Sequence, residues 1–134
     1  MWTVEKKTDR LVIITISSPF GHDDLAPFQA AVGKLLTEVP GRVVTCMDLR
    51  HSMVLAPDVA DALVGLMRRD NPRIERTAFL LNDNAVMGMQ VARMIREANH
   101  QSRRTFHDSA QLIAWLEESL TPSELQILHQ LLHV

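Results

Sequence analysis

The sequence predicts an α/β fold: a mixed, mostly parallel five-stranded sheet with an N-terminal hairpin and four helices, plus an extra C-terminal helix. Two observations support this prediction. Runs of β-branched and apolar residues alternate with longer amphipathic segments, which favours parallel strands joined by right-handed helical crossovers. The first two strand-like runs are separated only by a short polar turn, which indicates a hairpin.

The hairpin is expected at the N-terminus. Residues 2–6 alternate apolar and polar side chains, as a half-buried strand does. Residues 8–10 read Thr-Asp-Arg, a polar turn. Residues 11–16 are rich in β-branched side chains and almost continuously apolar, which is typical of a buried strand.

A helix and another strand follow the hairpin. Apolar residues recur at steps of three and four positions after Asp23 and Asp24, either of which would cap the helix. The Pro40-Gly41 pair would end it. Residues 43–47 are again apolar and β-branched, so they predict a buried strand that ends at Asp48.

The next two helices are also bounded by recognisable signals. Pro57 suits the first turn of a helix, because its missing N–H would be unpaired there anyway. The Asn71-Pro72 pair would end that helix, and residues 77–81 would form the following buried strand. Residues 82–84 read Asn-Asp-Asn and offer side-chain oxygens to cap the next helix, whose apolar stripe continues to Ala98.

The last third of the chain predicts an edge strand and two helices. Residues 103–106 are short and polar, as edge strands often are. Asp108 and Gln111 form the pattern of a capping box, in which each side chain would accept a hydrogen bond from an unpaired backbone N–H. Residues 121–124 read Thr-Pro-Ser-Glu and predict the start of a final helix over residues 125–133.

Composition limits the classes of function. The 134 residues fit one domain, and 46% hydrophobic residues can form a core without disulfides or a metal. The net charge of -2 argues against a nucleic-acid binder. Cys46 is single and lies in an apolar run, so we expect a buried thiol in a reducing compartment. Without an apolar run of membrane length or a signal core, we expect a cytoplasmic protein of bacterial type with no stable membrane insertion.

No set of residues predicts an active site. The sequence has no Gly-rich phosphate loop and no nucleophile-elbow pattern, so we expect no catalytic residues and no cofactor. His129 and His133 are one helical turn apart, but no third ligand accompanies them at a convincing spacing. A solvent-facing or capping role explains the pair better than a metal site.

Two apolar features suggest contact with another molecule. Met89 lies off the apolar stripe of its helix, and methionine adapts its shape at apolar contacts. The final helix is apolar on more than one side, so Leu125, Leu128 and Leu132 are candidates for self-association as a homodimer.

The order of elements, with two local segments, gives a family resemblance. Residues 45–50 read Thr-Cys-Met-Asp-Leu-Arg, and residues 104–108 read Arg-Thr-Phe-His-Asp before Leu-Ile-Ala-Trp-Leu at residues 112–116. In this respect the chain resembles STAS domains, the fold of anti-sigma-factor antagonists, and their SpoIIAA-like relatives. The resemblance covers residues 1–120 and implies one such domain, of which residues 121–134 would be a C-terminal helical extension.

The resemblance implies a non-enzymatic, regulatory protein-binding module. Antagonists of this type bind a partner through the loop after the third strand and the start of the second helix, where phosphorylation of a Ser or Thr switches the contact. Here the phosphoacceptor position falls near Pro57 or Asp58, neither of which a Ser/Thr kinase can modify. Ser52 in the loop could be modified instead, although an ordinary loop serine is the simpler interpretation. The expected partner-binding residues are Arg50, His51, Ser52, Met53, Pro57 and Asp58.

A second interpretation remains open. The SpoIIAA-like group shares its sheet with the CRAL-TRIO lipid-binding fold, so the chain could carry or sense a small apolar molecule or lipid. The methionine and leucine excess would then line a pocket instead of an interface. The short chain leaves little room for a closed lipid cavity, which places this interpretation second.

Overall fold

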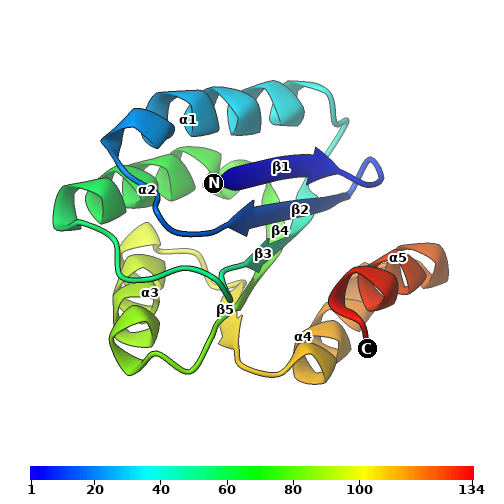
Figure 1. The fold of residues 1–134 in the computed structure, drawn as a ribbon. Coiled ribbons are helices and arrows are strands. Elements are labelled where there is room, and N and C mark those ends of the chain that lie inside the picture. The colour runs from blue at the N-terminus through cyan, green and yellow to red at the C-terminus, as the bar shows by residue number, and fades with distance from the viewer.

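The computed structural model describes all residues 1–134 and confirms the α/β fold class (Figure 1). One five-stranded sheet runs in the order β1-β2-β3-β4-β5. β1 and β2 are antiparallel, and every other neighbouring pair is parallel. The strands are β1 (Trp2–Lys6), β2 (Leu11–Ile16), β3 (Val43–Asp48), β4 (Ile74–Leu80) and β5 (Arg103–Phe106).

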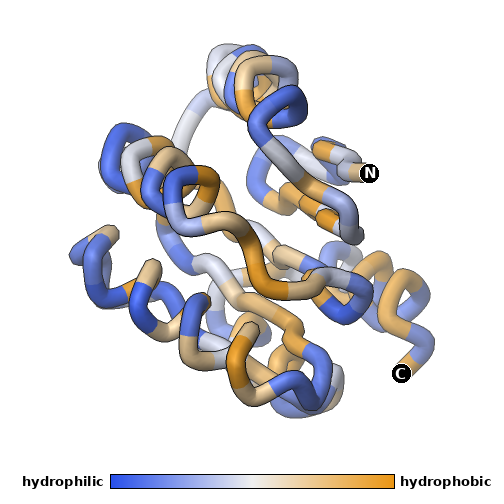
Figure 2. Tube along the Cα trace, turned by 60° about the vertical axis from the view of Figure 1, so that its left-hand side comes forward, coloured by the Kyte–Doolittle hydropathy of each residue, from blue (hydrophilic) through white to orange (hydrophobic).

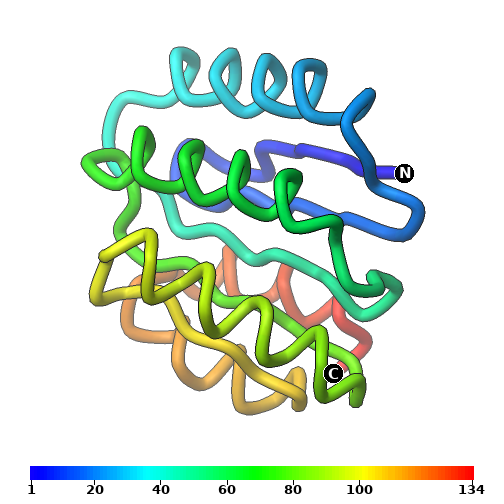
Figure 3. Tube along the Cα trace, turned by 90° about the vertical axis from the view of Figure 1, so that its left-hand side faces the viewer, coloured from blue at the N-terminus to red at the C-terminus, as the bar shows by residue number.

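Five helices cover the two faces of this sheet. Three of them, α1, α2 and α3, lie in a row on one face, and α4 and α5 lie on the other (Figure 3). Two short 3-10 turns, η1 and η2, follow α2 and α4. The bounds are α1 (His22–Thr37), α2 (Pro57–Asp70), η1 (Asn71–Arg73), α3 (Ala85–Ala98), α4 (Ser109–Leu116), η2 (Glu117–Ser119) and α5 (Pro122–Leu132).

Alternation along the strands divides the interior into two cores. In β2, Val12 and Ile14 face α1 to α3, whereas Leu11 and Ile13 face α4 and α5. Figure 2 shows apolar segments in the middle of the molecule, with helices around them. This double burial explains why β2 and β3 are nearly continuous apolar runs.

Three sequence predictions of element ends are wrong. Gly21, not Asp23 or Asp24, caps α1, and the Asp24 carboxylate instead accepts a hydrogen bond from the Gly21 N–H at 2.9 Å. Strand β4 begins three residues before the predicted position, at Ile74, because η1 is short and the chain extends at once. At α4 only Asp108 caps the helix, by accepting from Ala110 N–H; Gln111 makes no reciprocal bond.

Candidate functional site

The loop between β3 and α2 contains the partner-binding residues predicted from the sequence. Hydrogen bonds fix the beginning of this loop. The Arg50 guanidinium donates to both carboxylate oxygens of Asp48, at 3.0 and 2.9 Å, and the Arg50 backbone N–H adds a third bond. Burial alone would raise the pKa of Asp48, but these bonds outweigh it, so the pKa lies below its usual value. Asp48 therefore stays ionised and fixes the start of the loop.

The middle of the loop is anchored from inside. The Ser52 hydroxyl donates to the Ile16 carbonyl at 2.5 Å, and only 1% of Ser52 is exposed. The Asn82 side chain donates to the carbonyls of Arg50 and Ser52, at 3.1 and 2.9 Å. Ser52 therefore cannot contact a partner with its side chain, which corrects its place among the predicted partner-binding residues.

The outer side of the loop is apolar and exposed. Met53 and Val54 point outward, while Leu55 next to them is buried. Leu55 exchanges two 2.9 Å hydrogen bonds with the Gln90 side chain of α3. The loop and the first turns of α3 are thus locked together.

Gln90 is flanked on α3 by two further exposed apolar side chains. Val86 lies four positions before Gln90 and Met89 directly before it, so Val86 and Met89 are three positions apart on one helical face. Together with the two loop residues they define what we call the apolar patch: Met53, Val54, Val86 and Met89, exposed by 46% to 72%. The large exposed hydrophobic residues outside this patch are Met1, Leu131 and Val134.

The start of α2 borders the patch with a charged pair. Ala56 caps the helix without a side-chain bond, Pro57 occupies the first position, and the Asp58 carboxylate contacts the His22 ring from α1. The hydrogen bond with His22 is the main reason why the pKa of Asp58 lies below its usual value. The first residues of this helix, Ala56, Pro57 and Asp58, have no hydroxyl side chain.

The structure brings most of the predicted partner-binding residues together. His51, Met53, Pro57 and Asp58 are exposed around one loop, and Arg50 is half-buried. Sequence reasoning did not include His22, Gln90 or Val86 in the site. Val86 carried a usable signal, because it lies off the buried stripe of α3, whereas nothing local predicts the contact between His22 and Asp58 across 36 positions.

The predicted self-association residues lie elsewhere. Leu128 is fully buried and Leu132 nearly so, both in the core beneath α4 and α5, and Leu125 packs against that core. Leu128 and Leu132 therefore cover the domain's own sheet and have almost no exposed area for a dimer contact, whereas Leu125 is half-buried. The extra apolar width of α5 is explained by its contacts with both the sheet and α4.

The metal-ligating residue types and the single cysteine do not form a further site. No group of three or more His, Cys, Asp and Glu residues could hold a metal ion, and His129 bonds the Val134 carbonyl. Cys46 is fully buried, which raises the pKa of its thiol to about 12 and leaves it unreactive. None of the helices combines the length and the apolar character needed to cross a membrane.

A cavity of about 100 Å³ lies between the sheet and α1 to α3. Its wall is largely apolar, and Met47, Met67, Met87 and Met94 all contribute to it. Pockets for drug-sized ligands measure about 300–1,000 Å³. A long lipid chain therefore does not fit the space present here.

The sequence matches no protein-family model and no curated protein. The structure is similar to that of an uncharacterised protein of the DUF3478 family from Shewanella loihica PV-4, described as having a SpoIIAA-like fold. The TM-score is 0.65 at 14% identity, over 87% of this chain and 92% of the other. The chain thus has a STAS/SpoIIAA-like fold, as the sequence predicted. This comparison gives no evidence for the predicted kinship with CRAL-TRIO proteins.

Proposed function

We propose that this chain is a non-enzymatic, regulatory protein-binding module that uses the apolar patch and the adjoining start of α2. The observation that carries this proposal is the position of the patch. Four of the seven large exposed hydrophobic residues gather where the β3–α2 loop meets α3. This is the region through which the antagonists that the chain resembles contact their partners.

The surface has the layout of a protein interface. Polar residues close to the patch in the chain, His51, Asp58 and Asp83, are exposed, and a polar rim beside an apolar centre is typical of protein contacts. The hydrogen bonds of Asp48, Asn82 and Gln90 hold the loop in one shape. A preformed loop loses little conformational entropy on binding, which favours affinity.

The charge at the start of α2 specifies the partner further. Asp58 supplies a permanent negative charge where regulated antagonists add one by phosphorylation. We infer that the partner presents apolar side chains to the patch and a basic side chain to Asp58. Contact would then be constitutive and would not be switched by a Ser/Thr kinase. We expect the module to act in a reducing cytoplasm, consistent with its single buried thiol.

Site-specific photo-crosslinking in the source cell tests this proposal. A benzophenone amino acid at Met53 should capture one defined protein, while the same group at Gln130, exposed on α5 across the sheet, should not. Adding Asp58→Lys to the Met53 probe should reduce the yield at least several-fold without changing the melting temperature. The same crosslinks from both positions, or a yield that Asp58→Lys leaves unchanged, would contradict the proposed surface.

A further inference from the structure

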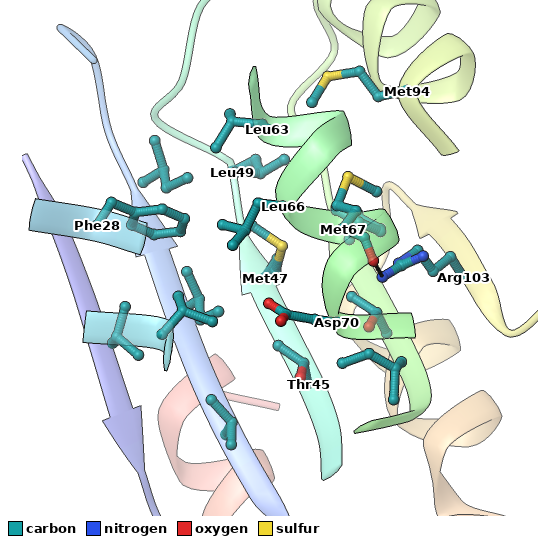
Figure 4. Close-up of a pocket in the computed structure, with 18 of the residues that line it drawn as sticks. Phe28, Thr45, Met47, Leu49, Leu63, Leu66, Met67, Asp70, Met94 and Arg103 are labelled. Carbon is teal, nitrogen blue, oxygen red and sulfur yellow. Dashed lines mark hydrogen bonds between the residues drawn. The ribbon is translucent and has the colours of Figure 1, made fainter. Parts of the chain in front are cut away.

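The cavity beneath α1 to α3 contains a row of polar side chains that an apolar core does not need. Thr45, Thr77 and Arg103 are register partners on three adjacent parallel strands, so they lie side by side across the sheet. All three are more than nine-tenths buried and line the cavity. Asp70, from the end of α2, joins them at the same place (Figure 4).

The two threonine hydroxyls are unused. Neither Thr45 nor Thr77 forms a side-chain hydrogen bond within the protein, although each is only 4% exposed. The protein has no fully enclosed side-chain polar atom that lacks a hydrogen-bond partner. Each of these two hydroxyl oxygens must therefore retain some accessible surface. The hydroxyls therefore border the cavity and can donate to a molecule inside it.

Arg103 carries a buried charge without a direct counterion. Its guanidinium donates to the Asn71 side-chain oxygen at 2.5 Å and to the Met67 carbonyl at 3.1 Å, and both acceptors are neutral. Five N–H donors are available on an arginine, so three remain. Burial lowers the pKa of Arg103 to about 10, which indicates that the protein does not fully compensate this charge.

Asp70 does not supply the missing counterion. Both of its carboxylate oxygens accept hydrogen bonds from Arg69, at 2.9 and 3.3 Å, so this pair is neutral as a unit. Asp70 acts on Arg103 only at longer range. The polar end of the cavity therefore keeps an excess of one positive charge and several free donors.

From this geometry we infer that the cavity binds a small carboxylate with a short apolar body. The carboxylate would accept hydrogen bonds from Arg103 and from the hydroxyls of Thr77 and Thr45, and the apolar body would lie among the methionines. Arginine and hydroxyl donors are a usual combination for carboxylate recognition. A charge-assisted contact in this buried site would also relieve the unpaired guanidinium.

The size of the cavity sets the length of the ligand. An engineered cavity of about 150 Å³ accommodates benzene. A space of about 100 Å³ accepts a body of only a few carbon atoms, with some adjustment of flexible methionines. Carboxylates of about four to six carbons are thus the expected class, and long fatty acids are excluded.

Methyl NMR offers a direct test, because the methionines separate into two groups. Met47, Met67, Met87 and Met94 line the cavity, while Met89 lies on the outer face of the same helix as Met87 and Met94. Protein labelled with ¹³C at the methionine methyls is titrated with sodium pentanoate, pentan-1-ol and pentylamine. We expect pentanoate to shift the four cavity methyls but not Met89, and to bind at least tenfold more tightly than pentan-1-ol.

Two substitutions locate the carboxylate. Thr77→Val keeps the shape of a side chain whose hydroxyl has no partner, so it should preserve the fold and weaken pentanoate binding several-fold. Arg103→Met should remove the preference for pentanoate over the alcohol; if it does not fold, Thr77→Val still decides. Thr15→Val, on the opposite face of the sheet, is the matched control and should bind as the unmodified chain does.

Four results would overturn the inference: no shift of the cavity methyls, equal binding of the alcohol, preference for the amine, or unchanged pentanoate affinity in Thr77→Val. Preference for the amine would assign the site to Asp70 instead of Arg103. The cavity and the apolar patch lie on opposite sides of α3. The ligand inference and the proposed protein-binding function can therefore be disproved independently of each other.

Discussion

Ser52 is the residue whose meaning changes most between sequence and structure. Its hydroxyl satisfies the Ile16 carbonyl in the interior, so it holds the loop in place. We expect Ser52→Ala to lower the free energy of unfolding by about 1–3 kcal/mol, because a buried acceptor loses its donor. Chemical denaturation measures this loss, with the exposed Ser123→Ala as a control that should change little.

The same contact makes phosphorylation of Ser52 incompatible with the fold. A phosphate or an aspartate there would place a charge in a site that is only 1% exposed. Ser52→Asp should therefore be more destabilising than Ser52→Ala in the same denaturation series. An equally stable Ser52→Asp would show that the loop opens easily and would restore Ser52 as a modification site.

Asp58 and His22 form an exposed pair whose contact can be detected through the pKa of Asp58. The bond from His22 lowers the pKa of Asp58 below the usual aspartate value of 3.8. Because the folded pKa is lowered, the stabilising effect is present above the unfolded pKa and is lost as the pH falls through the folded one. Carboxyl NMR should find the Asp58 pKa below 3.8 and, in His22→Ala, closer to 3.8; an unchanged value would exclude the pair in solution.

At the scale of elements, α5 is part of the core. Leu128 is fully buried beneath it, whereas Leu131 on the same helix is 37% exposed. Leu128→Ala should cost about 2–5 kcal/mol of unfolding free energy, because it removes buried methyl groups and leaves a cavity. Leu131→Ala is the matched control and should cost much less. Equal losses in thermal or chemical unfolding would mean that α5 does not pack as described.

The sequence predicted each helix and strand because their signals are local. Periodicity and caps act over a few residues, and the capping box of Thr121 and Glu124 forms as expected. Errors arose where a tertiary contact decided the outcome. Nothing near Ser52 reveals that a carbonyl 36 positions away accepts its hydroxyl proton. Leu128 and Leu132 looked like a free apolar surface because the sequence does not say which helices share a face.

The candidate sites divide in the same way. The β3–α2 loop was selected through a family resemblance, and Met89 because it lies off its helical stripe. The structure then added Val86 and brought these residues into one patch. The polar row of Thr45, Thr77 and Arg103 could not be predicted, because strand register brings together residues far apart in the chain. Each of them alone looks like an ordinary strand residue.

At the scale of the whole molecule, α5 connects the two ends of the chain. The Glu124 carboxylate accepts from the Thr8 hydroxyl in the hairpin turn, and Arg10 donates to the Ser119 carbonyl. Burial alone would raise the pKa of Glu124, but its hydrogen bonds, those with Thr121 and Thr8 foremost, lower it. The C-terminal helix thus holds the N-terminal hairpin against the sheet.

A chain that ends at Leu120 tests this role and the homodimer prediction together. Removing α5 exposes the apolar side of β2 and β3 around Leu11 and Val44, so we expect a large loss of stability and a tendency to aggregate. Circular dichroism and light-scattering mass would report both effects. If the full chain were instead a dimer and the shortened chain a well-folded monomer, α5 would be a self-association element. That result would contradict the structure, because the domain itself already buries Leu128 and Leu132 and leaves them almost no exposed area for a partner.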